Sequence, residues 1–204
     1  MLAELIHDLE QDYPGVLERG LCLLMSGVSW QYYEALICKL EDRASLRLTY
    51  LDGELEVVAP SRRQEGIKKR IAILLEAYFE ETDTEYFPLG STTFRSEQQR
   101  GGSEPDESYC LGVEKDVPDL VVEVSLTSGG IDKLTVYQRL KIPEIWFWQD
   151  EQLSIYCLRE GQYEKVTRSE LLPKLELELL KAYILHPQPL SAVKEFRQRI
   201  RQSM

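Results

Sequence analysis

A short apolar run near the middle of the chain constrains the fold more than any other segment. Residues 117–125 read VPDLVVEVS, and the turn-forming sequence Thr-Ser-Gly-Gly follows at 127–130. A proline at the start, β-branched residues inside and a glycine turn at the end predict a buried strand that leads into a helix. Buried strands next to helices are typical of α/β proteins, so the run predicts this fold class.

Two acids near this run suggest a metal site. Glu123 lies inside the apolar segment, where an ionised carboxylate is costly unless a cation or hydrogen-bond donors compensate it. Asp106 precedes it with 16 residues between them, which is enough for a loop and a return into an adjacent strand. If these strands pair, both carboxylates and the Val124 carbonyl can offer Mg²⁺ the oxygen ligands that it prefers. Lys133 would add a donor for water or phosphate.

A purely structural role is the alternative for the same residues. Pro-Asp pairs, here at 105–106 and 118–119, are common turn formers. A lysine or arginine inside the fold can neutralise Glu123 without any catalysis. Asp119 is interpreted as the end of the loop that precedes the strand. From the residues alone, this structural alternative is favoured over the metal site.

Composition narrows the class of protein. The 204 residues, 43% apolar and 29% charged, suit one globular domain with a substantial core. The sequence has no membrane-spanning run or signal-like start, so we expect a cytoplasmic protein without a membrane partner. Two histidines argue against a multi-histidine metal site, and four scattered cysteines indicate free thiols.

The hydrophobic pattern predicts the order of elements. Helices are expected at 2–11, 30–40 with a Ser29 cap, 62–81 with a Ser61–Gln64 capping box, 131–140, and 192–202 with a Ser191 cap. Strands are expected at 46–51 and 54–59, joined by an Asp-Gly turn, and at 84–89, 91–95, 107–111, 118–125, 144–149 and 152–158. Residues 97–104 are polar and contain glycine, which predicts an exposed loop. This order implies a central mixed β-sheet flanked by the helices at 62–81 and 131–140.

Seven short segments, taken in order, resemble one protein family. They are YLDGELE (50–56), APSRRQE (59–65), LGSTTF (89–94), EPDE (104–107), PDLVVEV (118–124), TSGGIDKL (127–134) and IPEIW (142–146). Together they resemble the Uma-type restriction-endonuclease-like family of the PD-(D/E)xK nuclease superfamily, over residues from about 46 to 158. The resemblance implies a restriction-endonuclease-like core and a DNA endonuclease that uses Mg²⁺ or Mn²⁺ to hydrolyse phosphodiester bonds. We expect one nuclease-like domain over residues 1–204, with an N-terminal helical part (1–45), the core (46–158) and a C-terminal extension (159–204).

The resemblance also assigns catalytic roles. Asp106 would be the first metal-binding acid and Glu123 the second, with Val124 supplying a carbonyl ligand. Lys133 would replace the lysine that the superfamily usually places two residues after the second acid, where Ser125 stands here. The lysine would then reach the site from the following helix.

Three further residues are possible accessories. Gln64 stands where related sequences usually carry histidine, and Glu65 beside it would supply an acid from the helix. Tyr137, one helical turn beyond Lys133, would position that lysine or only pack. The replacement at Gln64 leaves open a catalytically decayed nuclease fold that serves as a binding or assembly module.

DNA is the implied partner, although the net charge of −11 argues against tight non-specific binding. Arg62, Arg63 and Lys68 could contact the DNA backbone or only solvate their helix. Ser128, Gly129 and Gly130 precede a helix N-terminus that could bind phosphate, or form a simple strand-to-helix turn. Restriction-type nucleases commonly pair two active sites, so the resemblance also implies a homodimer. The aromatic strand at 144–148 and the C-terminal helix would offer apolar surface for that contact.

Overall fold

The computed structural model of the chain describes residues 11, 21–40, 46–125 and 130–203. The chain divides into two compact units, which we name by their sheets. The five-stranded unit comprises residues 1–65, 93–104 and 128–140, and the six-stranded unit comprises 66–92, 105–127 and 141–204. The protein is therefore α/β, with two sheets where the sequence predicted one. The expected helix at 2–11 lies outside the described residues apart from its last one, and the single domain over 1–204 stays a prediction.

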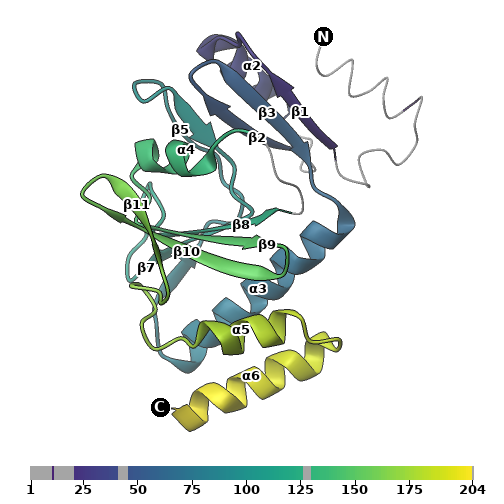
Figure 1. Cartoon of the computed structure of the whole chain (residues 1–204), viewed down its shortest axis with the longest axis vertical. Coiled ribbons are helices and arrows are strands. Elements are labelled where there is room, and N and C mark those ends of the chain that lie inside the picture. Colours follow the sequence, from purple (N-terminus) through teal and green to yellow (C-terminus); the bar gives the residue numbers. More distant parts are fainter. Residues whose placement is uncertain (1–10, 12–20, 41–45, 126–129, 204) are drawn as a thin grey trace. The chain divides into compact units, whose positions relative to one another are not determined.

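The five-stranded unit is an antiparallel sheet with the strand order β1-β3-β2-β6-β5 (Figure 1). Its strands are β1 (Leu21–Met25), β2 (Arg47–Leu51), β3 (Glu54–Ala59), β5 (Phe94–Ser96) and β6 (Gly101–Ser103). In the described part of this unit, the helices that lie wholly within it are α2 (Trp30–Leu40) and α4 (Lys133–Leu140). The helix expected at 131–140 beside a central mixed sheet is α4, and it packs on β6 of this antiparallel sheet.

Local sequence signals in this unit are confirmed. Ser29 caps α2, because its Oγ accepts the Tyr32 amide at 3.2 Å. Asp52 and Gly53 both have positive φ, 49° and 96°, as a type I′ hairpin turn between β2 and β3 requires. The rings of Tyr33 and Tyr50 stack with centroids 4.9 Å apart inside the core between α2 and the sheet. The cap and the turn depend only on residues close in the chain, so the hairpin and α2 were predictable from sequence.

The expected exposed loop at 97–104 was wrong in part. Residues 101–103 form β6, which pairs with both β2 and β5 and is fully buried. Gly102 allows this burial because a Cβ there would overlap the hydroxyl of Tyr33, whose ring has no exposed surface. Because two of the three residues are glycines, β6 lacks the hydrophobic alternation by which strands are recognised. The sequence signal is therefore missing for a physical reason.

The six-stranded unit contains the mixed sheet, with the strand order β11-β10-β9-β8-β7-β4. Its strands are β4 (Tyr86–Pro88), β7 (Glu107–Leu111), β8 (Leu120–Ser125), β9 (Glu144–Gln149), β10 (Gln152–Arg159) and β11 (Gln162–Val166). Strands β8 and β9 are parallel, and every other pair is antiparallel. Parallel neighbours need a crossover connection, and here the chain leaves β8 and passes through α4 before it enters β9.

Three helices accompany this sheet (Figure 1). They are α3 (Arg62–Glu81), whose first turn belongs to the five-stranded unit, α5 (Leu177–Ile184) and α6 (Pro189–Ser203). The core joins apolar side chains of all three helices to the sheet, and both Trp146 and Trp148 are buried in it. The two tryptophans are core residues, so they offer no surface for a homodimer.

The start of α6 and three other elements differ from the prediction. Helix α6 begins at Pro189, and Ser191 lies inside its first turn and does not cap it. Proline is well suited to a first helical position because it has no amide hydrogen to satisfy. Strands β1 and β11 and helix α5 were not predicted at all. Among the described residues, no helix is long and apolar enough to cross a membrane.

Ion pairs join α6 to the C-terminal end of α3. Arg197 bonds to both Glu80 and Glu81, and Arg201 bonds to Glu81 through two nitrogens at 2.5 and 2.7 Å. The hydrogen bonds from Arg201 and Arg197 lower the pKa of Glu81 from the ordinary 4.5 to about 2. Folding therefore favours the ionised form of this carboxylate.

Glu81→Gln should lower the melting temperature at pH 7 by several degrees and have little effect near pH 2.5. The folded-state pKa lies below the unfolded value, so the stabilisation is complete above about pH 4.5 and is lost as pH falls towards 2. Thermal unfolding of the parent and the variant between pH 7 and 2.5 measures this gap. Glu195→Gln, which removes an exposed acid from α6, is the control for loss of one charge. A gap that does not narrow with acid would contradict the ion-pair role.

Candidate active site

The two candidate acids lie on neighbouring strands of the six-stranded sheet. The antiparallel register of β7 and β8 pairs Glu107 with Val122, so Asp106, one residue before β7, falls opposite Glu123. Glu123 itself is central in β8 and pairs with Phe147 of β9 on the other side. The strand pairing that the 16-residue spacing allowed is therefore present.

A hydrogen bond holds Asp106 against β8. Its Oδ2 accepts the Val124 amide at 2.7 Å, in the residue that follows Glu123. Both acids are buried, with Asp106 8% and Glu123 3% exposed. Val122 and Val124 belong to the apolar core of this unit, and since strand side chains alternate, Glu123 and Ser125 lie on the opposite face of β8. The fold thus gathers two carboxylates and the Val124 backbone at one edge of the β7–β8 pair.

Asp119 has a different and structural role. Its Oδ2 accepts the Leu111 amide at 2.7 Å, and its carboxylate also pairs with Lys115 at 2.6 Å. It lies just before β8, at the end of the strand remote from Ser125. The interpretation of Asp119 as the end of a loop agrees with these contacts. Of the two Pro-Asp pairs, the one at 118–119 is therefore structural, and the one at 105–106 contains the candidate metal ligand.

Lys133 is the first residue of α4, which belongs to the five-stranded unit. Asp132 caps this helix, since its carboxylate accepts the Leu134 amide at 3.1 Å and the Thr135 hydroxyl at 2.6 Å. Arg139, in the last turn, bonds to Asp52 of the β2–β3 turn at 2.5 Å. The lysine therefore starts a helix that is capped at one end and tied to its own sheet at the other.

Tyr137 is packed inside the five-stranded unit. Its side chain is fully buried, and its hydroxyl lies 3.1 Å from the Ser103 hydroxyl, which in turn lies 3.3 Å from that of Thr49. The residue thus joins α4 to β6 and β2. Two roles were considered from sequence, positioning Lys133 or packing, and this contact is a packing contact.

Gln64 and Glu65 both lie in the first turn of α3. Gln64 completes the predicted capping box, because its Oε1 accepts the Ser61 amide at 2.7 Å while its own amide donates to Ser61 Oγ at 3.3 Å. Glu65 lies 3.8 Å from Arg47 of β2 in a partly exposed ion pair. Gln64 therefore has a helix-capping role.

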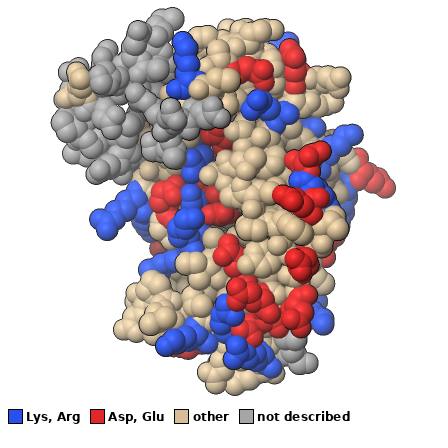
Figure 2. Space-filling view, turned by 180° about the vertical axis from the view of Figure 1, so that it is seen from behind, with Lys and Arg blue, Asp and Glu red and all other residues tan. Residues whose placement is uncertain are grey.

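The candidate DNA-contact residues differ in exposure. Arg62 and Arg63 are exposed, whereas Lys68 is only 5% exposed. Near Lys68, burial raises the pKa of Glu107, and the charges of Lys69 and Lys68 partly offset this rise. Ser128 and Gly129 lie outside the described residues. Figure 2 shows basic and acidic side chains interspersed on one face, without a large area of a single sign.

Sequence reasoning missed the buried acids Glu56, Glu107 and Glu144 and the half-buried Glu104. Glu144 of β9 accepts hydrogen bonds from Trp146, Ser169 and the Glu170 amide, within 2.6 to 2.9 Å. Glu104 accepts from Thr93 and the Leu48 amide, and burial raises its pKa. Glu56 of β3 is 4% exposed. An acid inside an apolar strand, the signal that found Glu123, would also have found Glu56 and Glu144.

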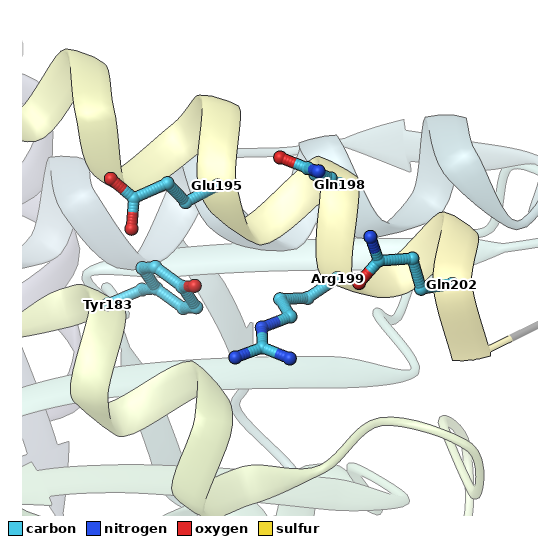
Figure 3. Close-up of a pocket in the computed structure, with 5 residues that line it drawn as sticks. All are labelled: Tyr183, Glu195, Gln198, Arg199 and Gln202. Carbon is cyan, nitrogen blue, oxygen red and sulfur yellow. The ribbon is translucent and has the colours of Figure 1, made fainter.

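No other cluster rivals the acid pair. In the part of the chain that the structure describes, no three His, Cys, Asp or Glu side chains gather to hold a metal ion. A polar pocket of about 290 Å³ lies between α5 and α6, lined by Tyr183, Glu195, Gln198, Arg199 and Gln202 (Figure 3). It contains one acid and one base on the surface of two helices, without a buried polar group directed into it.

The fold and site define an α/β protein with a buried acid pair on adjacent strands. The family model described as "Uma2: Putative restriction endonuclease" matches residues 30–186, well over half of the chain. The chain belongs to this family, which confirms the resemblance and extends it on both sides of residues 46–158. No curated protein matches the chain.

Proposed function

We propose that the protein is a Mg²⁺- or Mn²⁺-dependent DNA endonuclease that hydrolyses phosphodiester bonds. Membership of a restriction endonuclease family supports this proposal. The observation that carries it is the hydrogen bond from the Val124 amide to Asp106, which brings this acid to the strand that bears Glu123. The six-stranded mixed sheet with α3 is, in the same proposal, a restriction-endonuclease-like core.

The donor set fits a hard divalent cation. Mg²⁺ and Mn²⁺ bind carboxylate and carbonyl oxygens and keep several waters, so Asp106, Glu123 and the Val124 carbonyl would suffice. Two carboxylates on one strand pair also repel each other when both are ionised, which a cation would offset. When bound, the cation would supply an activated water and would stabilise the charge that builds on the phosphate. The protein would contribute a fixed geometry for its ligands.

Lys133 is the proposed donor to the attacking water or to the phosphate. The assignment rests on the family resemblance and on the position of Lys133 as the first residue of α4. An ammonium group can stabilise developing phosphoryl charge in this way. Arg62 and Arg63, both exposed, are the proposed contacts to the DNA backbone.

Cleavage assays on the purified protein test the proposal. Supercoiled plasmid, linear duplex and single-stranded DNA should be incubated with Mg²⁺, Mn²⁺, Ca²⁺ or EDTA. We expect cleavage of duplex DNA with Mg²⁺ or Mn²⁺ and none with EDTA. Absence of cleavage with either metal on all three substrates would reject the proposed activity. It would favour a decayed fold that acts as a binding module, for which the capping role of Gln64 is the supporting observation.

Lys133→Met should slow cleavage by about 100-fold and leave metal binding almost unchanged, because it removes a donor and no metal ligand. Single-turnover rates measure the first effect, and the Mn²⁺-induced shift in melting temperature measures the second. Lys141→Met, at an exposed position after α4, is the control for loss of a lysine. Equal rates for the parent and Lys133→Met would remove this lysine from the mechanism.

We also propose a homodimer, because restriction-type nucleases that cut both strands of a duplex commonly pair two active sites. The surfaces that the sequence suggested for the contact are largely used inside the six-stranded unit. Trp146 and Trp148 are buried, and the apolar face of α6 packs into the same core through Phe196 and Ile200. The proposal therefore rests on the chemistry alone, and light scattering at micromolar concentration should give twice the chain mass.

A further inference from the structure

A buried acid of the five-stranded unit contacts the segment that leads to Lys133. Glu56 lies in the middle of β3, and it is only 4% exposed. Its Oε2 accepts the Ile131 amide at 3.1 Å, two residues before Lys133. This amide precedes α4, so the helix itself does not supply its acceptor. A carboxylate from the sheet supplies it instead.

The backbone of Gly130 is fitted to this contact. Gly130 has φ of +116°, a conformation that side-chain-bearing residues rarely adopt. A Cβ at this position would overlap Glu56 Oε2, so the turn passes directly against the carboxylate. Two independent features therefore require glycine at position 130: its positive φ and the close approach of Glu56 Oε2 to its Cα.

The polar face of the sheet also points to α4. Glu56 is the direct cross-strand partner of Thr49, so both side chains lie on the same face. Thr49 is joined through Ser103 to Tyr137 of α4. The Cys22 thiol of β1 lies close enough to both Glu56 and Lys133 for their charges to change its pKa. Partial burial and the Glu56 carboxylate raise this pKa, and the Lys133 ammonium lowers it. Glu56 and Lys133 thus lie near one thiol on one face.

We propose that Glu56 is a positioning residue for the reaction, which holds the Gly130–Ile131 turn and thereby fixes Lys133 at the start of α4. The inference rests on the proposed function, and it assigns to Glu56 no contact with DNA or metal. A hydrogen bond from a backbone amide to a buried side-chain oxygen is directional and depends on the position of that oxygen, which suits it to fix a turn. A small displacement of a reacting group lowers the rate strongly, so loss of this contact should reduce cleavage.

Two conservative variants separate the hydrogen bond from the charge. Glu56→Gln keeps the length and an acceptor oxygen but removes the charge. Glu56→Asp keeps the charge but withdraws the acceptor by one methylene. If Glu56 acts through the Ile131 amide, the Gln variant should resemble the parent and the Asp variant should not. Glu54→Gln, a partly exposed acid of the same strand that bonds to Ser26, is the matched control.

The first measurement is amide hydrogen exchange of the peptide that covers residues 130–134. Glu56→Asp should speed this exchange by about tenfold, as expected for loss of one protecting hydrogen bond, and should leave the β2–β3 hairpin unchanged. Glu56→Gln and Glu54→Gln should match the parent. This readout does not depend on nuclease activity, so it tests the contact even if the parent does not cleave DNA.

The second measurement is the single-turnover cleavage rate with saturating Mg²⁺. We expect Glu56→Asp to be slower by about tenfold, with the DNA concentration for half-maximal rate unchanged, and Glu56→Gln to lie within about twofold of the parent. An impaired Gln variant with a normal Asp variant would overturn the inference in favour of a role for the charge. Parental exchange and rates in both variants would also overturn it. A parent that never cleaves would reject the proposed function, whatever the exchange shows.

Discussion

Asp106→Asn and Glu123→Gln will each lower the rate of Mg²⁺-dependent DNA cleavage by about 1000-fold or more. Each change removes one negative charge from the proposed metal site with almost no change in shape. If the cation supplies the activated water and stabilises phosphoryl charge, the loss of a ligand raises the barrier by about 4 kcal/mol or more. Asparagine at its Oδ1 can still accept the Val124 amide, so the contact that Asp106 makes with β8 can survive. Plasmid nicking under single-turnover conditions, with melting curves for each variant, measures the effect.

Asp119→Asn is the matched control for both changes. It lies in the second Pro-Asp pair and near the opposite end of the same strand, about 13 Å from Glu123 at the usual rise per residue. Its carboxylate is bonded to Lys115 and to the Leu111 amide, so the change should lower stability more than catalysis. Cleavage by this variant within about tenfold of the parent is expected. Normal cleavage by both Asp106→Asn and Glu123→Gln would reject the assigned site.

Local interactions made much of the fold predictable from the sequence. The capping box of Ser61 and Gln64 and the Asp52–Gly53 turn each involve residues close in the chain, and their signals do not depend on distant partners. The spacing of Asp106 and Glu123 left room for a loop and a return into an adjacent strand, and β7 does pair with β8. The order of the residues thus allowed Asp106 to lie beside Glu123, and the register of the two strands places it there.

Long-range contacts account for what the sequence did not reveal. Helix α4 was placed beside the mixed sheet, yet it is tied to the antiparallel sheet by Tyr137 with Ser103 and by Arg139 with Asp52. Neither contact leaves a periodic pattern in the sequence, because the partners are far apart in the chain. Strand β6 was missed because glycine gives no hydrophobic signal, although it lies at the centre of these contacts.

For the candidate site, the sequence indicated the acids but not their hydrogen-bond partners. Asp106 and Glu123 stood out because one follows a proline and the other lies among valines. Glu56 and Glu144 also lie in apolar strands, but nothing in their spacing indicated which backbone amides they accept. The difference between a possible metal ligand and a structural carboxylate lies in its hydrogen-bond partners, which only the fold reveals. Glu144 shows the structural case most clearly.

Glu144 is a buried carboxylate surrounded by donors. It is 1% exposed and accepts from Trp146 Nε1 at 2.6 Å, from Ser169 Oγ at 2.6 Å and from two backbone amides of the 170–171 turn. The Cys157 thiol is a further donor at 3.3 Å. Burial and the Glu144 carboxylate raise the pKa of Cys157 to about 12, so this thiol stays protonated and keeps its hydrogen for the bond. The carboxylate therefore joins β9, β10 and the turn before α5.

Glu144→Ala should lower the free energy of unfolding by about 3–5 kcal/mol, because it leaves three buried and two partly buried donors without their acceptor. Glu144→Gln should be only somewhat milder, since one oxygen remains but the new NH₂ group faces other donors. Urea unfolding followed by tryptophan fluorescence suits the measurement, because Trp146 is itself one of the donors. Glu114→Ala, at an exposed position of the same unit, should change stability by less than about 0.5 kcal/mol. A loss below about 1 kcal/mol for Glu144→Ala would mean that the turn and the strands rearrange to satisfy these donors in another way.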